Sequence, residues 1–194
     1  MEREIKMQPY VSMDLESTGL DPDTCQIIEI GAVFDDPRKP LAECPTFHAY
    51  VRHKLYVGEP FAFNLNHKIM GRLAEQPAGF KYICADDIPY ELAAWVKDCG
   101  WDMKEKSLLF AGKNFGGFDY AFLRRLSGFM TALKFKHRFL DPGSMYFDPF
   151  VDEVPPSSSD CLRRAGQQHQ VAHEALADAI AVCKMIRCRY GIPL

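Results

Sequence analysis

Residues 11–20, VSMDLESTGL, place two carboxylates in an otherwise apolar run that ends in a Ser-Thr-Gly turn. Side chains alternate between the two faces of a β-strand, so Asp14 and Glu16 share one face, about 7 Å apart. Two carboxylates at this spacing repel each other when both are ionised and poorly solvated. The segment therefore predicts a strand with one face in the core and one acidic face beside a positive group.

Length and composition limit the class of protein. The chain has 194 residues and is 47% hydrophobic, which suffices for one well-buried core and is short for two domains. A formal charge of −3 is not typical of a general nucleic-acid binder, but it does not exclude an enzyme that binds a few phosphates through metal ions. Seven cysteines without a CxxC pair indicate reduced thiols. With no membrane-length apolar run and no apolar signal segment, we expect a soluble cytoplasmic protein without a membrane partner.

Apolar periodicity and turn residues predict an α/β fold. Strands are expected at 10–15, 26–34, 46–52, 107–112 and 138–141. Helices are expected at 61–74, 86–98, 117–130, 158–165 and 173–190. The first three strands follow one another through turn-rich links, whereas the later strands alternate with helices. This order predicts an antiparallel meander that merges into a parallel sheet.

Two further acids stand on apolar helix faces. Asp119 lies at helical spacing from Leu123, and Asp178 lies at helical spacing from Val182. A carboxylate that faces a core is costly unless it is paired or bound to a cation. Each acid alone is most simply a helix cap or an ion-paired side chain, but four acids on three separate elements favour one common site. Oxygen ligands without a Cys or His cluster point to Mg²⁺ or Mn²⁺.

Three segments resemble the motifs of one enzyme family. DLESTG at 14–19 resembles the first motif of the DEDD exonucleases, KNFGGFDYAFL at 113–123 resembles the second, and HEALADA at 173–179 resembles the third motif of the histidine subclass. The motifs occur in order over residues 10 to 190. The chain is thus similar to the DEDDh 3′→5′ exonucleases, which include oligoribonuclease, ribonuclease T and polymerase proofreading subunits. The resemblance implies one exonuclease domain over 1–194 with a ribonuclease-H-like fold, a mixed five-stranded sheet flanked by helices.

The resemblance also implies the chemistry. Asp14, Glu16, Asp119 and Asp178 would hold two divalent cations, Mg²⁺ or Mn²⁺, at the terminal phosphodiester. His173 would accept the proton of the attacking water as general base. The substrate would be the 3′ end of a single-stranded or short RNA or DNA, and the products would be nucleoside 5′-monophosphates.

Substrate contacts are expected around the same motifs. Backbone amides at Ser17 and Thr18, together with Glu16, would hold the 3′-hydroxyl, and Leu20 would wedge against the last base. Asn114, in the second motif, could orient a metal ligand or merely cap a turn.

Aromatic side chains are candidates for stacking on single-stranded bases. Phe115 and either Phe61 or Phe63 are the better candidates. Phe118 and Phe122 stand at a helical spacing that is more typical of a core.

Two other functions stay open at this point. One is a catalytically inactive exonuclease fold that only binds nucleic acid, and the other is a ribonuclease-H-like endonuclease. The presence of all four acids and His173 favours an active enzyme, and the spacing of His173 and Asp178 favours the exonuclease branch. A homodimer is plausible by analogy with the family.

Overall fold

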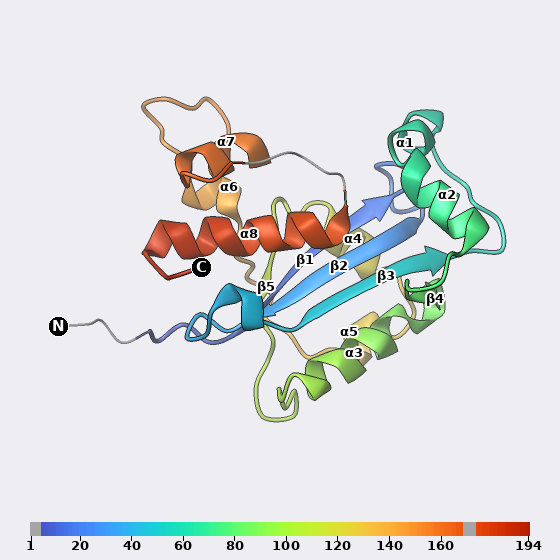
Figure 1. Cartoon of the computed structure of the whole chain (residues 1–194), viewed down its shortest axis with the longest axis horizontal. Coiled ribbons are helices and arrows are strands. Elements are labelled where there is room, and N and C mark those ends of the chain that lie inside the picture. The colour runs from blue at the N-terminus through green and yellow to red at the C-terminus, as the bar shows by residue number, and fades with distance from the viewer. Residues whose placement is uncertain (1–4, 169–173) are drawn as a thin grey trace.

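The computed structural model describes residues 5–168 and 174–194, and its centre is a mixed five-stranded sheet (Figure 1). The strands are β1 (Tyr10–Ser17), β2 (Ile27–Asp35), β3 (Thr46–Arg52), β4 (Tyr82–Cys84) and β5 (Phe110–Ala111), in the spatial order β4-β3-β2-β1-β5. β2 pairs antiparallel with β1 and β3, whereas β5 runs parallel to β1 and β4 runs parallel to β3. The chain is therefore an α/β fold, and its layout is consistent with that of ribonuclease H.

Helices flank both faces of this sheet (Figure 1). They are α1 (Pro60–Leu65), α2 (His67–Glu75), α3 (Ile88–Asp98), α4 (Asp119–Leu123), α5 (Phe129–Ala132), α6 (Pro142–Met145), α7 (Ser158–Arg164) and α8 (Ala175–Tyr190), with short 3₁₀ turns at Leu41–Glu43 and Ala85–Asp87. Within the described part of the chain, no helix is both long and apolar enough to cross a membrane.

Side-chain alternation along β1 and β2 separates two layers of core. Met13 of β1 and Ile30 of β2 belong to the layer that includes residues of α3, α4 and α5. Tyr10 and Val33 belong to the opposite layer, with residues of α7 and α8. All nine residues of β2 are buried, as expected for a central strand that is covered on both faces. The even-numbered residues of β1, acids included, therefore face α8.

One expected strand is wrong. Residues 138–141 form only an isolated bridge, between Leu140 and Ala111. The fifth strand is instead β4, which pairs with β3 over three residues. A strand of three residues is too short to show an alternating pattern, so β4 could not be predicted from apolar periodicity.

Two expected helices are interrupted. The helix expected at 61–74 is divided at Asn66 into α1 and α2. The helix expected at 117–130 is divided into α4 and α5, and α5 is preceded by Gly128 with φ of 86°. A residue in this left-handed conformation cannot continue an α-helix.

Candidate metal centre

Strand β1 delivers Asp14 and Glu16 to the face of the sheet that α8 covers. On β2, Gly31 stands opposite Asp14, and Glu29 stands opposite Glu16. The pairing of β1 with β2 shifts register between Glu16 and Ser17, where the chain leaves the strand. The two acids are half-buried at the end of the strand ladder, as the alternation in the sequence predicts.

Helix α8 adds a third carboxylate. Asp178 lies in its first turn, where the Asp178 N–H donates to the Glu174 carbonyl over 3.1 Å. One carboxylate oxygen from each of Asp14, Glu16 and Asp178 lies within 4.8 Å of the others. Oxygens bound to one Mg²⁺ at about 2.1 Å lie up to about 4.2 Å apart, so small side-chain adjustments would bring these three onto one cation.

Asp119, the fourth predicted ligand, lies beside this group without belonging to it. It is the first residue of α4, is 2% exposed, and accepts the Leu15 N–H at Oδ1 over 3.0 Å. All four acids line one pocket of about 250 Å³. The structure therefore brings the four predicted acids to one pocket, and three of them within reach of one cation.

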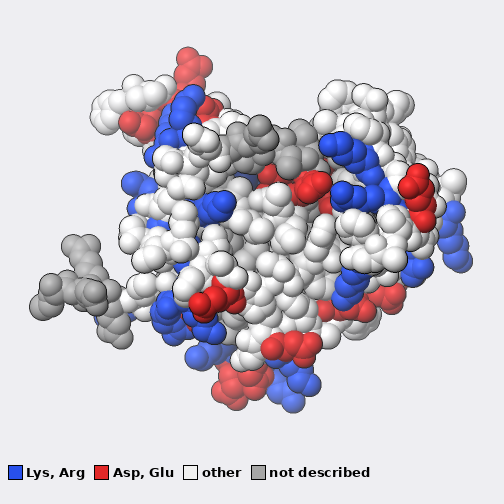
Figure 2. All heavy atoms as spheres, in the orientation of Figure 1, with Lys and Arg blue, Asp and Glu red and all other residues white. Residues whose placement is uncertain are grey.

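The remaining walls of this pocket come from four parts of the chain: β1, the segment before α4, α7 and α8. They consist of Leu15, Lys113, Phe118, Ser158, Leu162, Ala181, Val182 and Met185. Among the described residues that line the pocket, Lys113 is the one basic side chain. Figure 2 shows acidic side chains gathered in a hollow of the surface, with basic side chains beside them over α2.

Burial raises the pKa values of Asp14, Glu16 and Asp119, and repulsion by neighbouring carboxylates adds to it at Asp14 and Glu16. Burial, followed by the charges of Asp119 and Asp178, holds the pKa of Asp14 well above its ordinary value. Burial and the charge of Glu29 raise the pKa of Glu16 to about 7. Burial also raises the pKa of Asp119 to about 7, against the opposing effect of its backbone hydrogen bonds. A divalent cation would relieve this repulsion, so the donor set fits Mg²⁺ or Mn²⁺.

Asn66 is a contributor to the site that the sequence did not reveal. It is 4% exposed, and its Nδ2 donates to the Ser17 carbonyl over 3.0 Å. Its hydrogen bond to Glu16 lowers the pKa of that carboxyl, in part offsetting burial. Among the described residues, Asn66 Oδ1 has no hydrogen-bond partner. Asn66 thus fixes the strand end that carries Glu16, but it stands within an amphipathic helical run that gave no hint of this role.

The expected contacts to a 3′-hydroxyl stay a prediction, and the structure shows what Ser17 and Thr18 bond to without a substrate. The Thr18 N–H donates to the Gln26 carbonyl over 2.9 Å, so this amide is already used within the turn. The Ser17 hydroxyl likewise donates to the Gly19 carbonyl over 2.6 Å. Leu20 is 75% exposed, which leaves it open to the contact with a base that the sequence predicts.

Phe115 cannot stack on a base in this structure, contrary to expectation. It is fully buried, stacked on Phe110 at 5.2 Å between ring centroids and packed edge-on against Phe139. Asn114 has φ of 60°, and its carbonyl accepts the N–H groups of Gly117 and Phe118. Of the two roles considered for Asn114, these bonds favour the turn cap.

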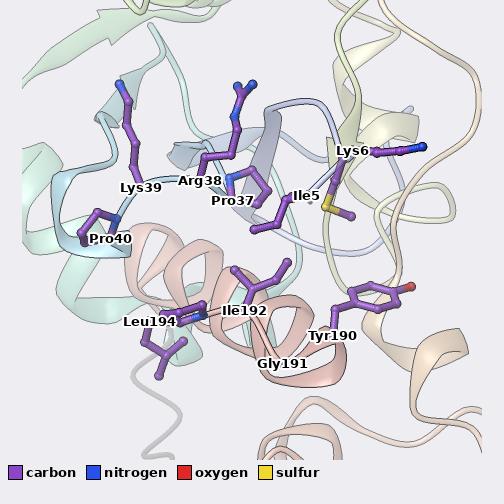
Figure 3. Close-up of a pocket in the computed structure, with 12 residues that line it drawn as sticks. Ile5, Lys6, Pro37, Arg38, Lys39, Pro40, Tyr190, Gly191, Ile192 and Leu194 are labelled. Carbon is purple, nitrogen blue, oxygen red and sulfur yellow. The ribbon is translucent and has the colours of Figure 1, made fainter. Parts of the chain in front are cut away.

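His173 lies outside the described residues, so its role stays a prediction. A hollow of about 920 Å³ lies away from the acids, where the N-terminal segment meets the C-terminus. Figure 3 shows Ile5 and Ile192 on opposite sides of it, with Lys6 and Arg38 extending away. None of the described residues that line this hollow is an acid, and none belongs to the metal centre.

Comparison with known protein families and with characterised proteins finds no match to this chain. The assignment of function therefore depends on the geometry of the acidic pocket and on the motifs that form it.

Proposed function

We propose that this chain is a metal-dependent 3′→5′ exonuclease, which hydrolyses the terminal phosphodiester of RNA or DNA and releases nucleoside 5′-monophosphates. The observation that supports this proposal is the convergence of Asp14, Glu16 and Asp178 within 4.8 Å, in a pocket that also holds Asp119. An all-oxygen donor set suits Mg²⁺ or Mn²⁺, and the resemblance to the DEDDh enzymes suggests two ions.

Each residue of the site has a distinct task in this proposal. Asp14, Glu16 and Asp178 hold the cations, and Asp119 completes the ligand set. Divalent cations bound at such a site supply charge neutralisation at the phosphate and activate water. Lys113, on the pocket wall, contacts a phosphate of the bound strand. His173 acts as general base, a role assigned from its motif alone.

A degradation ladder tests the proposal. RNA and DNA labelled at the 5′ end, from dinucleotides to long single strands, should shorten one nucleotide at a time with Mg²⁺ or Mn²⁺ and stay intact with excess chelator. A 3′-phosphate should block degradation, because it adds charge and bulk beside Glu16. Cleavage of a circular strand would instead indicate an endonuclease, and binding of nucleic acid without any cleavage would indicate an inactive relative.

Variants of the acids connect the activity to this pocket. Asp14→Asn and Asp178→Asn should each lower the rate by at least about 10³-fold, because a metal site supplies several kcal/mol of transition-state stabilisation. Glu91→Gln is the matched control, since Glu91 lies on α3 and forms an exposed ion pair with Lys81 at 2.7 Å. It should keep the wild-type rate. Unchanged cleavage in both aspartate variants would contradict the proposed site.

A further inference from the structure

Strand β2 carries two fully buried carboxylates, Glu29 and Asp35. They are six residues apart, so both point to the face of the sheet that α8 covers. A buried carboxylate is costly unless it is paired or hydrogen-bonded. Each of these two finds its partners at a different end of α8.

Asp35 holds the C-terminal end of the helix. Arg187, 1% exposed in the last turns of α8, forms a buried ion pair with Asp35, and its Nε lies 3.1 Å from both carboxylate oxygens. The Tyr10 hydroxyl also donates to Asp35. This end is thus fixed by an ion pair in which opposite charges meet.

Glu29 holds the N-terminal end of the same helix. Its Oε2 accepts the Ala175 N–H over 3.1 Å, and its Oε1 lies 2.6 Å from His48 Nε2. The N-cap residue of α8, Glu174, makes no capping hydrogen bond with its own side chain. A carboxylate of the neighbouring strand therefore satisfies an N–H group that the first turn leaves unpaired, at the end of the helix where negative charge is favourable.

Close packing reinforces this anchor. A Cβ atom at Gly31 would lie 2.1 Å from the Leu176 nitrogen, so the backbone of α8 rests directly on β2. One turn further, the Ser12 hydroxyl donates to the Ala179 carbonyl over 2.8 Å. The helix turn that carries Asp178 thus contacts β2 before this residue and β1 after it.

We infer that Glu29 is a positioning residue, which fixes the first turn of α8 from β2 and thereby holds Asp178 beside Asp14 and Glu16. The inference rests on the proposed function, because it treats Asp178 as a metal ligand. The negative charge of Glu29 disfavours ionisation of Glu16, so a carboxylate at position 29 repels the ionised acids of the metal-free site. Its two oxygens, however, serve two partners at once, Ala175 and His48.

Two variants of Glu29 and one control test this inference. Glu29→Met keeps the side-chain volume but removes both acceptors, whereas Glu29→Gln keeps an acceptor for Ala175 and removes the charge. Asp35→Asn is the matched control, since it alters an equally buried acid of the same strand at the other end of α8. If Glu29→Met does not fold, Glu29→Ala takes its place. If Asp35→Asn does not fold, Tyr10→Phe serves as the control instead.

Amide hydrogen exchange of the metal-free protein gives the first measurement. In Glu29→Met, exchange at Ala175 to Asp178 should speed up at least tenfold, with little change near Arg187. Asp35→Asn, the control, should speed up exchange near Arg187 and leave Ala175 to Asp178 little changed. Equal exchange at Ala175 in wild type and Glu29→Met would overturn the inference.

Calorimetric titration with Mn²⁺ gives the second measurement. Glu29→Met should bind Mn²⁺ roughly 10–100-fold more weakly, the usual effect of losing a residue that orients a metal ligand, and Glu29→Gln should recover most of this loss. Asp35→Asn should lower the melting temperature but keep the affinity within about twofold. If Asp35→Asn weakened Mn²⁺ binding as much as Glu29→Met does, Glu29 would only stabilise the fold in general, and the inference would be wrong. A wild type that binds Mn²⁺ but cleaves no nucleic acid would refute the proposed function and leave this inference standing.

Discussion

Glu16 and Asp119 are acids whose pKa values lie near 7, far above those of exposed carboxyl groups. Burial is the first cause at both residues, and repulsion by Glu29 and Asp178 adds to it at Glu16. A cation that binds to these oxygens must displace the protons that they hold near neutral pH. Metal binding at this pocket is therefore coupled to proton release.

We expect Mn²⁺ to bind at least about tenfold more weakly at pH 6 than at pH 8, because protonated Glu16 and Asp119 compete with the ion. Isothermal titration calorimetry in two buffers of different ionisation enthalpy should show proton release on binding near pH 7. In Glu16→Gln the number of protons released should fall. An affinity that is constant over this pH range would contradict the raised pKa values.

Phe115 and Phe61 give a second test at the scale of single residues. Phe115 is fully buried and Phe61 is 75% exposed, so the two aromatic candidates for base stacking are now distinguishable. Phe115→Ala should cost about 3–5 kcal/mol in the free energy of unfolding, the usual effect of such a truncation in a core. Phe61→Ala should change stability by less than about 0.5 kcal/mol and raise KM for single strands. Urea unfolding and steady-state kinetics measure both effects, and a reversed pattern would contradict the assignment.

Among the elements, those with strong periodicity were predictable from sequence. The alternation in β1 correctly predicted that Asp14 and Glu16 share a face, and the apolar stripes on two helices brought Asp119 and Asp178 to the same pocket. The break between α1 and α2 was not predictable, because Asn66 bonds to the Ser17 carbonyl, 49 residues away in the chain. A contact of this kind leaves no local pattern.

Gly31 controls how closely α8 approaches the sheet. Gly31→Ala would place a Cβ atom 2.1 Å from the Leu176 nitrogen and 2.3 Å from the Ala175 carbonyl carbon, so the first turn of the helix must shift. We expect a loss of about 2–4 kcal/mol in the free energy of unfolding and weaker Mn²⁺ binding.

Gly71→Ala is the control for this substitution. Gly71 lies inside α2, and no described residue beyond its chain neighbours and the helix's own backbone has an atom within 4 Å of the position that its Cβ would occupy. Alanine there should stabilise the protein by up to about 1 kcal/mol, because it favours the helix, and should leave metal binding unchanged. Chemical denaturation and metal titration check both variants. Equal stability of Gly31→Ala and wild type would mean that the helix does not rest on β2.

At the scale of the whole molecule, the acidic pocket couples stability to pH and to metal. In the unfolded chain Glu16 and Asp119 have pKa values of 4.5 and 3.8, whereas in the folded chain both lie at about 7. Between these values the folded chain binds more protons than the unfolded chain, so the free energy of unfolding falls as the pH rises. This contribution is fully present below about pH 4 and is lost as the pH rises through 7.

The metal-free protein should therefore melt at a higher temperature at pH 5.5 than at pH 8. Each of the two acids loses about 2 kcal/mol as the pH rises from 5.5 through 7. Together they should lower the melting temperature by roughly 10 °C, since about 1 kcal/mol corresponds to about 2–4 °C for a chain of this size. At pH 8, Mn²⁺ at 100 times its Kd should restore stability by about 2.7 kcal/mol. The comparison with Glu16→Gln is decisive, because the melting temperature of this variant in chelator should depend less on pH. Scanning calorimetry of both proteins, with chelator and with Mn²⁺, measures these shifts. A wild-type melting temperature that rises from pH 5.5 to pH 8 in chelator would show that the acids are not held together in the folded chain.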